Sequence, residues 1–276
     1  MRVALTGASG FVGKHLQKSF SDHIIIERHD SVETILEKLE GVDAVFNLAG
    51  APIIKRWSSH YKDVLLSSRI QTTQRVVQAI NQSKVKHFIS TSAIGAYPDD
   101  VACDESITNY NNDFLGSLTK AWEAEALLCQ KPTSIIRFGV ILGKDAGALS
   151  KMLLPFKLGL GGIIADGKMM TSWIDIHDLM RIYAYVLEKK LTGIINATAP
   201  HPVTNYTFTK ALGQALHRPT IIPLPGFVLK LLFGEGATAI TSSKEVYPKV
   251  LSESGFKFDY EDIKSSLNHI LSEERR

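Results

Sequence analysis

Short apolar runs alternate with amphipathic stretches along the chain as far as about residue 197. The runs are rich in Val, Ile, Leu and Phe, which is typical of strands buried on both faces of a parallel sheet. Between them, apolar residues recur every three or four positions, as in helices with one buried face. The pattern predicts about six strand and helix units, with strands at residues 2–5, 24–26, 42–48, 85–92, 134–143 and 193–197.

Beyond residue 200 the apolar positions follow helical spacing almost throughout. Helices are predicted there at residues 205–216, 227–233 and 260–271, in addition to those that lie between the strands. Alternating strands and helices predict an α/β fold with a doubly wound parallel sheet. The C-terminal helices are expected to form a smaller lobe that lies over the strand ends.

A glycine turn joins the first predicted strand to the first predicted helix. Glycine at three positions lets the backbone turn tightly and approach a phosphate, and the helix start adds free N–H groups. An ATP-binding loop of the type GxxxxGK[ST] is excluded, because positions 8 and 15 are Ala and His. The turn therefore predicts a dinucleotide site, with cofactor contacts from Gly7, Ser9, Gly10, Phe11, Val12 and Gly13.

The end of the second strand bears on the choice between NAD and NADP. Glu27 can accept hydrogen bonds from the adenosine ribose, which favours NAD. Arg28 can pair with the 2′-phosphate, which favours NADP. We predict NADP on the strength of Arg28, with Lys55 or Arg69 as helpers, while NAD stays open as the alternative.

Small and hydroxyl-bearing residues follow other strands at the points where they leave the sheet. Ligands of open parallel sheets bind beyond the carboxyl ends of the strands, so further contacts are expected there. A helix after the third strand carries Arg69, which can face the same edge. The additional cofactor contacts predicted in this way are Leu48, Ala49, Gly50, Arg69, Thr91, Gly139 and Val140.

This assignment divides the chain into two parts. Residues 1–143 and 172–198 are predicted to form a dinucleotide-binding domain of the Rossmann type. Residues 144–171 and 199–276 are predicted to form a substrate-binding lobe, since a glycine-rich stretch at 158–163 marks a change of composition.

Composition and charge exclude several classes of function. The 31 basic and 28 acidic side chains are spread along all 276 residues, so no basic stripe predicts binding to nucleic acid. Two cysteines make neither a disulfide framework nor a zinc knuckle, and the nine histidines form no metal-ligand spacing. The apolar segment 221–233 is too short and too interrupted to span a bilayer. With a strand predicted at residue 2 in place of a signal peptide, we expect a cytoplasmic protein. We also expect a monomer or a homodimer.

The motifs resemble those of the extended short-chain dehydrogenase/reductase superfamily. The resemblance rests on residues 6–13, 47–50, 90–92 and 173–179. More closely, the chain is similar to NAD-dependent epimerase/dehydratase family proteins of the branch labelled cell-division inhibitors. The residues that carry this closer resemblance include 47–53, Arg56, Trp57, Ser68, Arg69, Trp122, Glu123, Arg137, 152–162 and 202–205.

The resemblance implies hydride transfer at a carbonyl or sugar-like carbon, with a Ser and a Tyr-x-x-x-Lys motif as the acid/base system. Ser92 and Lys120 match this pattern, but position 116 is Gly in place of the Tyr. Tyr97 on the strand-exit loop can supply a phenol instead, and Tyr110 is a further candidate. We predict Ser92, Tyr97 and Lys120 as the catalytic residues.

Two functions remain open. The first is an NAD(P)-binding oxidoreductase or epimerase-like enzyme that acts on a small polar substrate between the sheet and the lobe. The second is a catalytically weak dinucleotide-binding regulator or redox sensor, which the missing tyrosine supports. Asp175 and His177 are interpreted as residues that cap a helix or close a lid, not as a catalytic pair.

Overall fold

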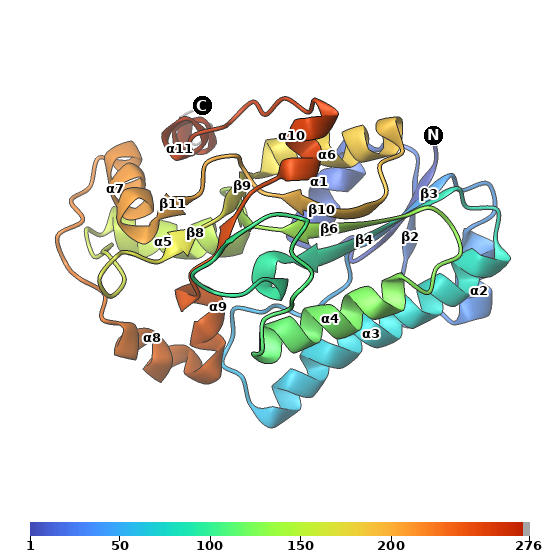
Figure 1. The fold of residues 1–276 in the computed structure, drawn as a ribbon, viewed down its shortest axis with the longest axis horizontal. Coiled ribbons are helices and arrows are strands. Elements are labelled where there is room, and N and C mark those ends of the chain that lie inside the picture. The colour runs from blue at the N-terminus through green and yellow to red at the C-terminus, as the bar shows by residue number, and fades with distance from the viewer. Residues whose placement is uncertain (273–276) are drawn as a thin grey trace.

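The computed structural model describes residues 1–272 and is organised around a six-stranded sheet in which all neighbouring strands are parallel (Figure 1). The doubly wound α/β fold is therefore confirmed. Across the sheet the strands are β10 (Gly193–Ala197), β6 (Thr133–Phe138), β4 (His87–Ala93), β3 (Ala44–Asn47), β1 (Val3–Thr6) and β2 (His23–Ile26).

The order of the strands reverses at β1. The chain runs outward from β1 to β2 and then returns to place β3 on the other side of β1. The connections from β1 and from β3 consequently leave the sheet in opposite directions. In open α/β sheets such a reversal opens a crevice at the carboxyl ends of the strands, where ligands bind.

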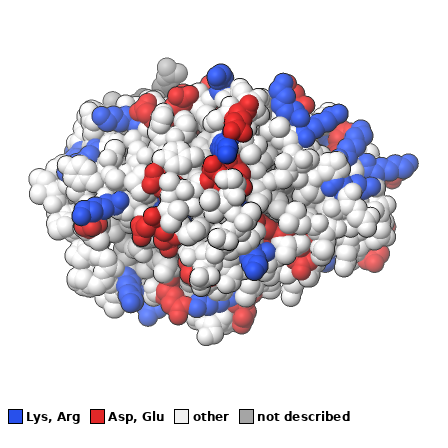
Figure 2. All heavy atoms as spheres, in the orientation of Figure 1, with Lys and Arg blue, Asp and Glu red and all other residues white. Residues whose placement is uncertain are grey.

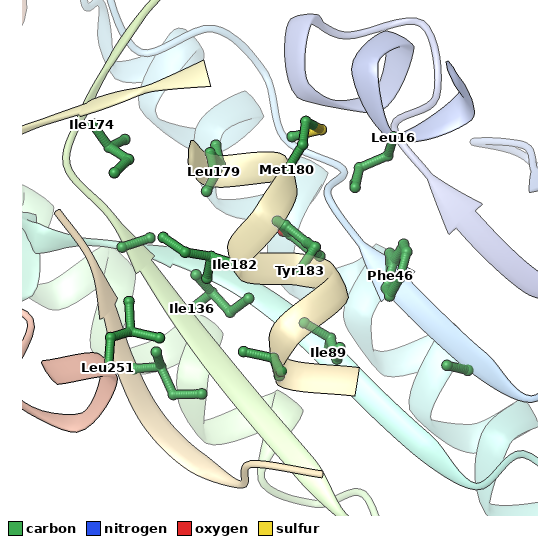
Figure 3. Packing of buried hydrophobic residues seen from close by; sticks show 14 of the residues in the cluster. Leu16, Phe46, Ile89, Ile136, Ile174, Leu179, Met180, Ile182, Tyr183 and Leu251 are labelled. Carbon is green, nitrogen blue, oxygen red and sulfur yellow. The ribbon is translucent and has the colours of Figure 1, made fainter. Parts of the chain in front are cut away.

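Helices cover both faces of the sheet, because side chains of alternate strand residues point to opposite faces. One face packs against α1 (Phe11–Ser19) and α6 (Ile176–Lys189), whose Ile182 and Tyr183 lie among strand residues such as Phe46 and Ile89 (Figure 3). The other face packs against α2 (Val32–Lys38), α3 (Ser59–Gln82) and α4 (Phe114–Ala126).

Helices from the second half of the chain build a core of their own. It contains α5 (Gly147–Lys157), α7 (Asn205–Leu216) and α11 (Ile263–Ser272), with Trp173 buried among them. Three short strand pairs stand apart from the six-stranded sheet: β7 (Val140–Leu142) with β9 (Trp173–Asp175), β8 (Met170–Thr171) with β11 (Val203–Thr204), and β5 (Ala102–Cys103) with β12 (Glu245–Val246). The remaining elements are η1 (Ile94–Ala96), α8 (Gly226–Phe233), η2 (Gly234–Ala237), α9 (Thr238–Thr241) and α10 (Lys249–Ser254).

The lobe and the sheet interlock. Leu251 of α10 and Phe256 fall within the range predicted for the lobe, but they belong to the core cluster that the sheet shares with α6, and Figure 3 shows Leu251 in it. Conversely, Trp173 falls within the range predicted for the sheet domain and packs in the lobe. The division into two domains stays a prediction, and its last four residues, 273–276, lie outside the described residues.

Charged side chains of both signs are interspersed on the face of the molecule that Figure 2 shows. Within residues 1–272, no helix combines the length and the apolar character needed to cross a bilayer.

The position of α10 in the sheet core leads to a test of how the C-terminal part is anchored. Replacing the fully buried Leu251 by Ala removes packing against α6 and β10, and we expect the free energy of unfolding to fall by about 2–5 kcal/mol. Urea unfolding measures the change. The matched control is Leu154→Ala at a leucine that is 67% exposed, which should shift stability by less than about 0.5 kcal/mol. Equal unfolding midpoints for the two variants would contradict this anchoring.

Candidate functional site

The glycine turn between β1 and α1 has a conformation that side chains do not tolerate. Gly7 has φ +65°, and a Cβ there would lie 2.9 Å from the carbonyl carbon and oxygen of Leu48. A Cβ at Gly13 would lie 2.4 Å from the carbonyl oxygen of Gly7. Glycine at the first position therefore permits the turn and its contact with β3, and glycine at the last position permits close packing of the helix on the turn.

The N-terminus of α1 is open to a ligand. Gly10 is its N-cap residue, no side chain caps it, and its first turn carries no acidic residue. By contrast, Ser31, Ser58 and Asp113 cap α2, α3 and α4 with their side chains. Helix N-terminal N–H groups without an internal partner, together with the helix dipole, attract phosphate. The geometry of this turn therefore fits the pyrophosphate of a dinucleotide.

Thr6 joins the glycine turn to the loop after β3. Its Oγ1 accepts hydrogen bonds from the backbone N–H groups of Leu48, at 2.9 Å, and Ala49, at 3.0 Å. The same hydroxyl donates to Oδ1 of Asn47 at 2.9 Å. Leu48, Ala49 and the glycine turn, which were predicted separately, are thus held together at the point where the strand order reverses.

Asn47 extends this network below the edge of the sheet. Its Nδ2 donates to Oγ1 of Thr73 at 2.8 Å and to Oγ of Ser90 at 3.2 Å. The indole Nε1 of Trp122 also donates to Oγ1 of Thr73, at 3.0 Å. These side chains are buried away from water, and their hydrogen bonds fix α3 and α4 against the strand ends.

Arg69 was predicted to contact the cofactor, which stays a prediction; in the structure its guanidinium supports the wall of the loop after β3. It is buried and donates to the backbone carbonyls of Leu65, at 3.1 Å, and Ala51, at 3.0 Å. A Cβ at Gly50 would lie 2.9 Å from its Cζ, so only glycine lets the loop approach so closely. Burial lowers the pKa of Arg69 to about 10. These two hydrogen bonds go to backbone carbonyls, which directs the guanidinium into the protein.

The loop after β2 carries Arg28, and the guanidinium of Arg75 contacts the backbone of this loop. Glu27 and Arg28 are both exposed, and the backbone N–H of Glu27 donates to Asp30 at 2.7 Å. Nη2 of Arg75, from α3, donates to the backbone carbonyl of Arg28 at 2.9 Å. Sequence reasoning missed Arg75 because this contact joins positions 47 residues apart. Its position on the same helix as Arg69 was the only signal of it.

Phe11 lies at the start of α1 and closes one side of the glycine turn. A Cβ at Gly143 would lie 2.4 Å from its ring, so the chain after β7 passes directly over it. Ser9 is exposed beside it, and Val12 packs partly into the sheet core. A ligand at the N-terminus of α1 therefore has an aromatic ring beside it.

The residues predicted at the exits of β4 and β6 have mixed positions. Thr91 faces α6, where its Oγ1 lies 3.0 Å from the hydroxyl of Tyr183. The backbone N–H groups of Gly139 and Val140 bond to the carbonyls of Ala197 and Ser172. Thr91 thus joins β4 to α6, and Gly139 and Val140 join β6 and β7 to neighbouring segments, while the contact of all three with a cofactor stays a prediction.

Ser92 belongs to a buried ionic cluster. Its hydroxyl donates to Oε1 of Glu123 at 2.5 Å. Arg137 donates through Nε to Oε1 and through Nη2 to Oε2 of the same carboxylate, both at 2.8 Å. The phenol of Tyr110 donates to Oε2 at 2.6 Å. One carboxylate therefore holds a serine, a tyrosine and an arginine at the carboxyl end of β4.

The register of the sheet explains how this cluster forms. Ser92 of β4 and Asn196 of β10 both pair with Arg137 of β6, so their side chains point to the same face. Tyr97 is fully buried and donates to Oδ1 of Asn196 at 2.9 Å. The guanidinium of Arg137 lies 4.6 Å from the ring centre of Tyr97 and 5.4 Å from that of Tyr110. Burial raises the pKa of Tyr97, which keeps its phenol protonated.

The three predicted catalytic residues do not all lie together in the structure. Ser92 and Tyr97 share the cluster, but the hydroxyl of Tyr97 is used by Asn196. Lys120 is exposed on α4, whereas Thr119 and Glu123 face inward. The helical phase that buries Glu123 turns Lys120 towards solvent, so the structure gives no support to a shared role with Ser92.

Asp175 caps α6, as the sequence indicated, because its Oδ1 accepts from the backbone N–H of His177 at 2.8 Å. Nε2 of His177 lies 3.1 Å from a carboxylate oxygen of Asp259. Among residues 1–272, no three His, Cys, Asp or Glu side chains group in a way that could hold a metal ion.

Comparison with known proteins gives consistent results. The model described as "NAD dependent epimerase/dehydratase family" matches residues 3–198, and a domain of unknown function, DUF1731, matches residues 224–270. The chain is 35% identical to the chloroplastic epimerase family protein SDR39U1 homolog of Arabidopsis thaliana, over 98% of this chain and 87% of that protein. It is 32% identical to the epimerase family protein YfhF of Bacillus subtilis, over 100% and 99% of the two chains.

A solved structure has the same fold over its whole length. It is the human epimerase family protein SDR39U1 (isoform2) with NADPH, which superimposes with a TM-score of 0.92 at 31% identity and covers 99% of each chain. The cofactor named there and the NAD in the family description both agree with the expected cofactor class, NADP or NAD.

The three hydrogen bonds of Thr6 lead to a test of how the site is assembled. Thr6→Val keeps the shape but leaves the N–H groups of Leu48 and Ala49 without their acceptor, at about 1–3 kcal/mol for each unpaired group. We expect urea unfolding to show this loss of stability. Thr6→Ser, which keeps the oxygen, is the matched control and should lie much closer to wild type. Equal stabilities of the Val and Ser variants would show that Thr6 does not hold the loop.

Proposed function

Because this chain belongs to the NAD dependent epimerase/dehydratase family, we propose that it binds NADP(H) at the carboxyl edge of its sheet and transfers hydride to or from a small polar substrate. The reacting carbon would be that of a carbonyl or a sugar-like group. The observation that carries this proposal is the glycine turn at the uncapped N-terminus of α1, which Thr6 holds against Leu48 and Ala49.

The phosphates of the cofactor would bind to N–H groups and arginine side chains at this edge of the sheet. The first N–H groups of α1 would hold the pyrophosphate. Arg28 and Arg75 would hold the 2′-phosphate, because Arg75 contacts the backbone of Arg28 and each guanidinium can provide forked donors for phosphate oxygens. The NADPH in the human relative supports this choice. NAD, with Glu27 on the ribose, remains the alternative.

The substrate would lie between the sheet edge and the lobe. Lys151 of α5 donates to the carbonyl of Ile54 at 3.2 Å, and Arg56 donates to the carbonyl of Leu231 in α8 at 3.2 Å. These contacts join the loop after β3 to the lobe. The division into a dinucleotide domain, residues 1–143 and 172–198, and a substrate lobe, residues 144–171 and 199–276, is kept here as a proposal.

The chain's own residues would orient the substrate. Bound NADPH would supply the hydride, and Ser92, at the exit of β4, would act through Glu123, the carboxylate to which it donates. Tyr97 and Lys120 have no step in this proposal, because the first is buried on Asn196 and the second is exposed. A cytoplasmic location and a monomeric or dimeric state remain predictions.

A second function is favoured by the burial of Ser92, which is 1% exposed and donates to Glu123. A hydroxyl that is fully engaged fits a catalytically weak regulator that senses the cofactor. The role of cell-division inhibitor, which the closer resemblance suggests, belongs with this alternative.

Binding and turnover separate the two functions. NADPH and NADH are titrated against the intrinsic fluorescence, and reduction is then assayed over a panel of carbonyl compounds and nucleotide sugars. Turnover that falls in Ser92→Ala supports the enzyme. Binding without turnover supports the regulator, and no binding at millimolar cofactor overturns both.

The proposed role of Arg28 and Arg75 leads to a prediction about the choice between NADP and NAD. Arg28→Ala and Arg75→Ala should each weaken NADPH about 10–100-fold, the effect of losing a charge-assisted hydrogen bond, and leave NADH nearly unchanged. Dissociation constants from fluorescence titration measure this. Lys55→Ala is the control, because Lys55 lies over the ring of Tyr61 instead. Equal losses for NADPH and NADH would refute the phosphate contact.

A further inference from the structure

The first turn of α4 has no space for the tyrosine that the Tyr-x-x-x-Lys motif would place at position 116. A Cβ at Gly116 would lie 2.0 Å from the backbone oxygen of Asn111 and 2.6 Å from its carbonyl carbon. The preceding loop therefore occupies the position where the missing side chain would begin. The backbone at Asn111 thus fills the space that a side chain at position 116 would need.

This loop is held firmly in place. The backbone N–H of Asn111 donates to the carbonyl of Ala96 at 2.7 Å, which ties the loop to the turn after β4. Asp113 caps α4 by accepting from the N–H of Gly116 at 2.7 Å. The residue just before Asn111 is consequently fixed beside the end of β4.

That residue is Tyr110, and its phenol reaches the carboxylate on which Ser92 lies. The phenol donates to Oε2 of Glu123 at 2.6 Å, and Ser92 donates to Oε1 at 2.5 Å. Arg137 balances the charge of this carboxylate. Ser92, Glu123 and Arg137 are at most 2% exposed, whereas Tyr110 is half-buried. Of these four residues, Tyr110 is the one that is not fully buried, and we therefore take it as the group that a ligand entering from solvent would meet.

We propose that Tyr110 is the proton donor of this site and that its loop supplies the phenol that position 116 lacks. The inference rests on the proposed function. A hydride supplied by bound NADPH forms the new C–H bond, which reduces the carbonyl carbon and oxidises the cofactor. The electron pair of the carbonyl bond moves to oxygen, the phenolic proton of Tyr110 forms the O–H bond, and water reprotonates the tyrosinate.

Glu123 acts as a positioning residue in this step, since it aims the phenol and does not contact the substrate. Burial and the hydrogen bond to Glu123 raise the pKa of Tyr110 to about 12, against the opposing effect of Arg137. The phenol therefore stays protonated at neutral pH, which suits donation in the direction of reduction. Oxidation of an alcohol requires tyrosinate, so its rate should rise steadily with pH, while reduction stays nearly constant between about pH 6 and 9.

A test that needs no substrate uses protein labelled with ¹³C at tyrosine Cζ. Tyr110→Phe assigns the signal. The nicotinamide ring of NADP⁺ carries a positive charge, so saturating NADP⁺ should shift the Tyr110 signal and lower the pKa of its phenol, and NADPH should do so much less. The matched reference is Tyr247, whose phenol donates to Glu245 at 2.6 Å outside this cluster. Its signal should not move.

Kinetics give the second readout. Tyr110→Phe should lower kcat for carbonyl reduction about 100-fold, with KM and the dissociation constant of NADPH nearly unchanged. Tyr247→Phe is the control and should keep the wild-type rate. Circular dichroism and the NADPH titration establish that the Tyr110→Phe variant is folded.

The outcomes are distinct from those of the proposed function. A protein that binds NADP⁺ but whose Tyr110 signal does not respond, or one that keeps full turnover as Tyr110→Phe, overturns the role of Tyr110 and leaves cofactor binding intact. A protein that does not bind NADP⁺ overturns the proposed function and this inference together.

Discussion

The ion pair of Glu123 and Arg137 is the interaction on which the reacting end of the site depends. Both side chains are almost fully buried, and both nitrogens of the guanidinium fork contact the carboxylate. Removing one partner of a buried pair costs about 3–5 kcal/mol, because the other charge is left uncompensated. The pair also orders its neighbours: Ser92 and Tyr110 donate to the carboxylate, and Tyr97 packs on the guanidinium. Strand, helix and loop are therefore fixed at one point.

The other end of the site depends on neutral hydrogen bonds. Thr6 and Asn47 join β1 to β3, where the strand order reverses, and Gly7 removes the Cβ that would separate them. A reversal of strand order opens the carboxyl edge, and these bonds set how far it opens. The cofactor end is thus shaped by backbone geometry, which can accept the pyrophosphate that all dinucleotides share. The reacting end is shaped by a buried ion pair, which positions the side chains proposed to take part in the reaction.

Local patterns in the sequence were sufficient to predict the fold and the cofactor class. Strand and helix periodicity act over a few residues, and the glycine turn lies within one such unit. The rest depended on contacts between distant segments. Arg75 meets Arg28 across 47 positions, and Tyr97 meets Asn196 across 99. Lys120 is exposed, because the motif fixes its position along α4 but not the side that α4 buries, and its catalytic role stays a prediction. In the sequence, Gly116 showed only that the motif tyrosine is missing. The structure shows that the backbone of Asn111 fills the space where its side chain would begin.

The resting partner of Tyr110 also bears on how a phenol without a neighbouring lysine can act. Catalysis gains only from contacts that strengthen in the transition state. In the resting protein the phenol donates to a carboxylate whose charge Arg137 already shares, so that hydrogen bond holds the phenol in place without competing strongly for its proton. When the carbonyl carbon receives the hydride, the carbonyl oxygen develops a full negative charge with no such compensation. Exchange from Glu123 to that oxygen therefore becomes favourable only as the charge forms, which is the behaviour expected of a preorganised donor.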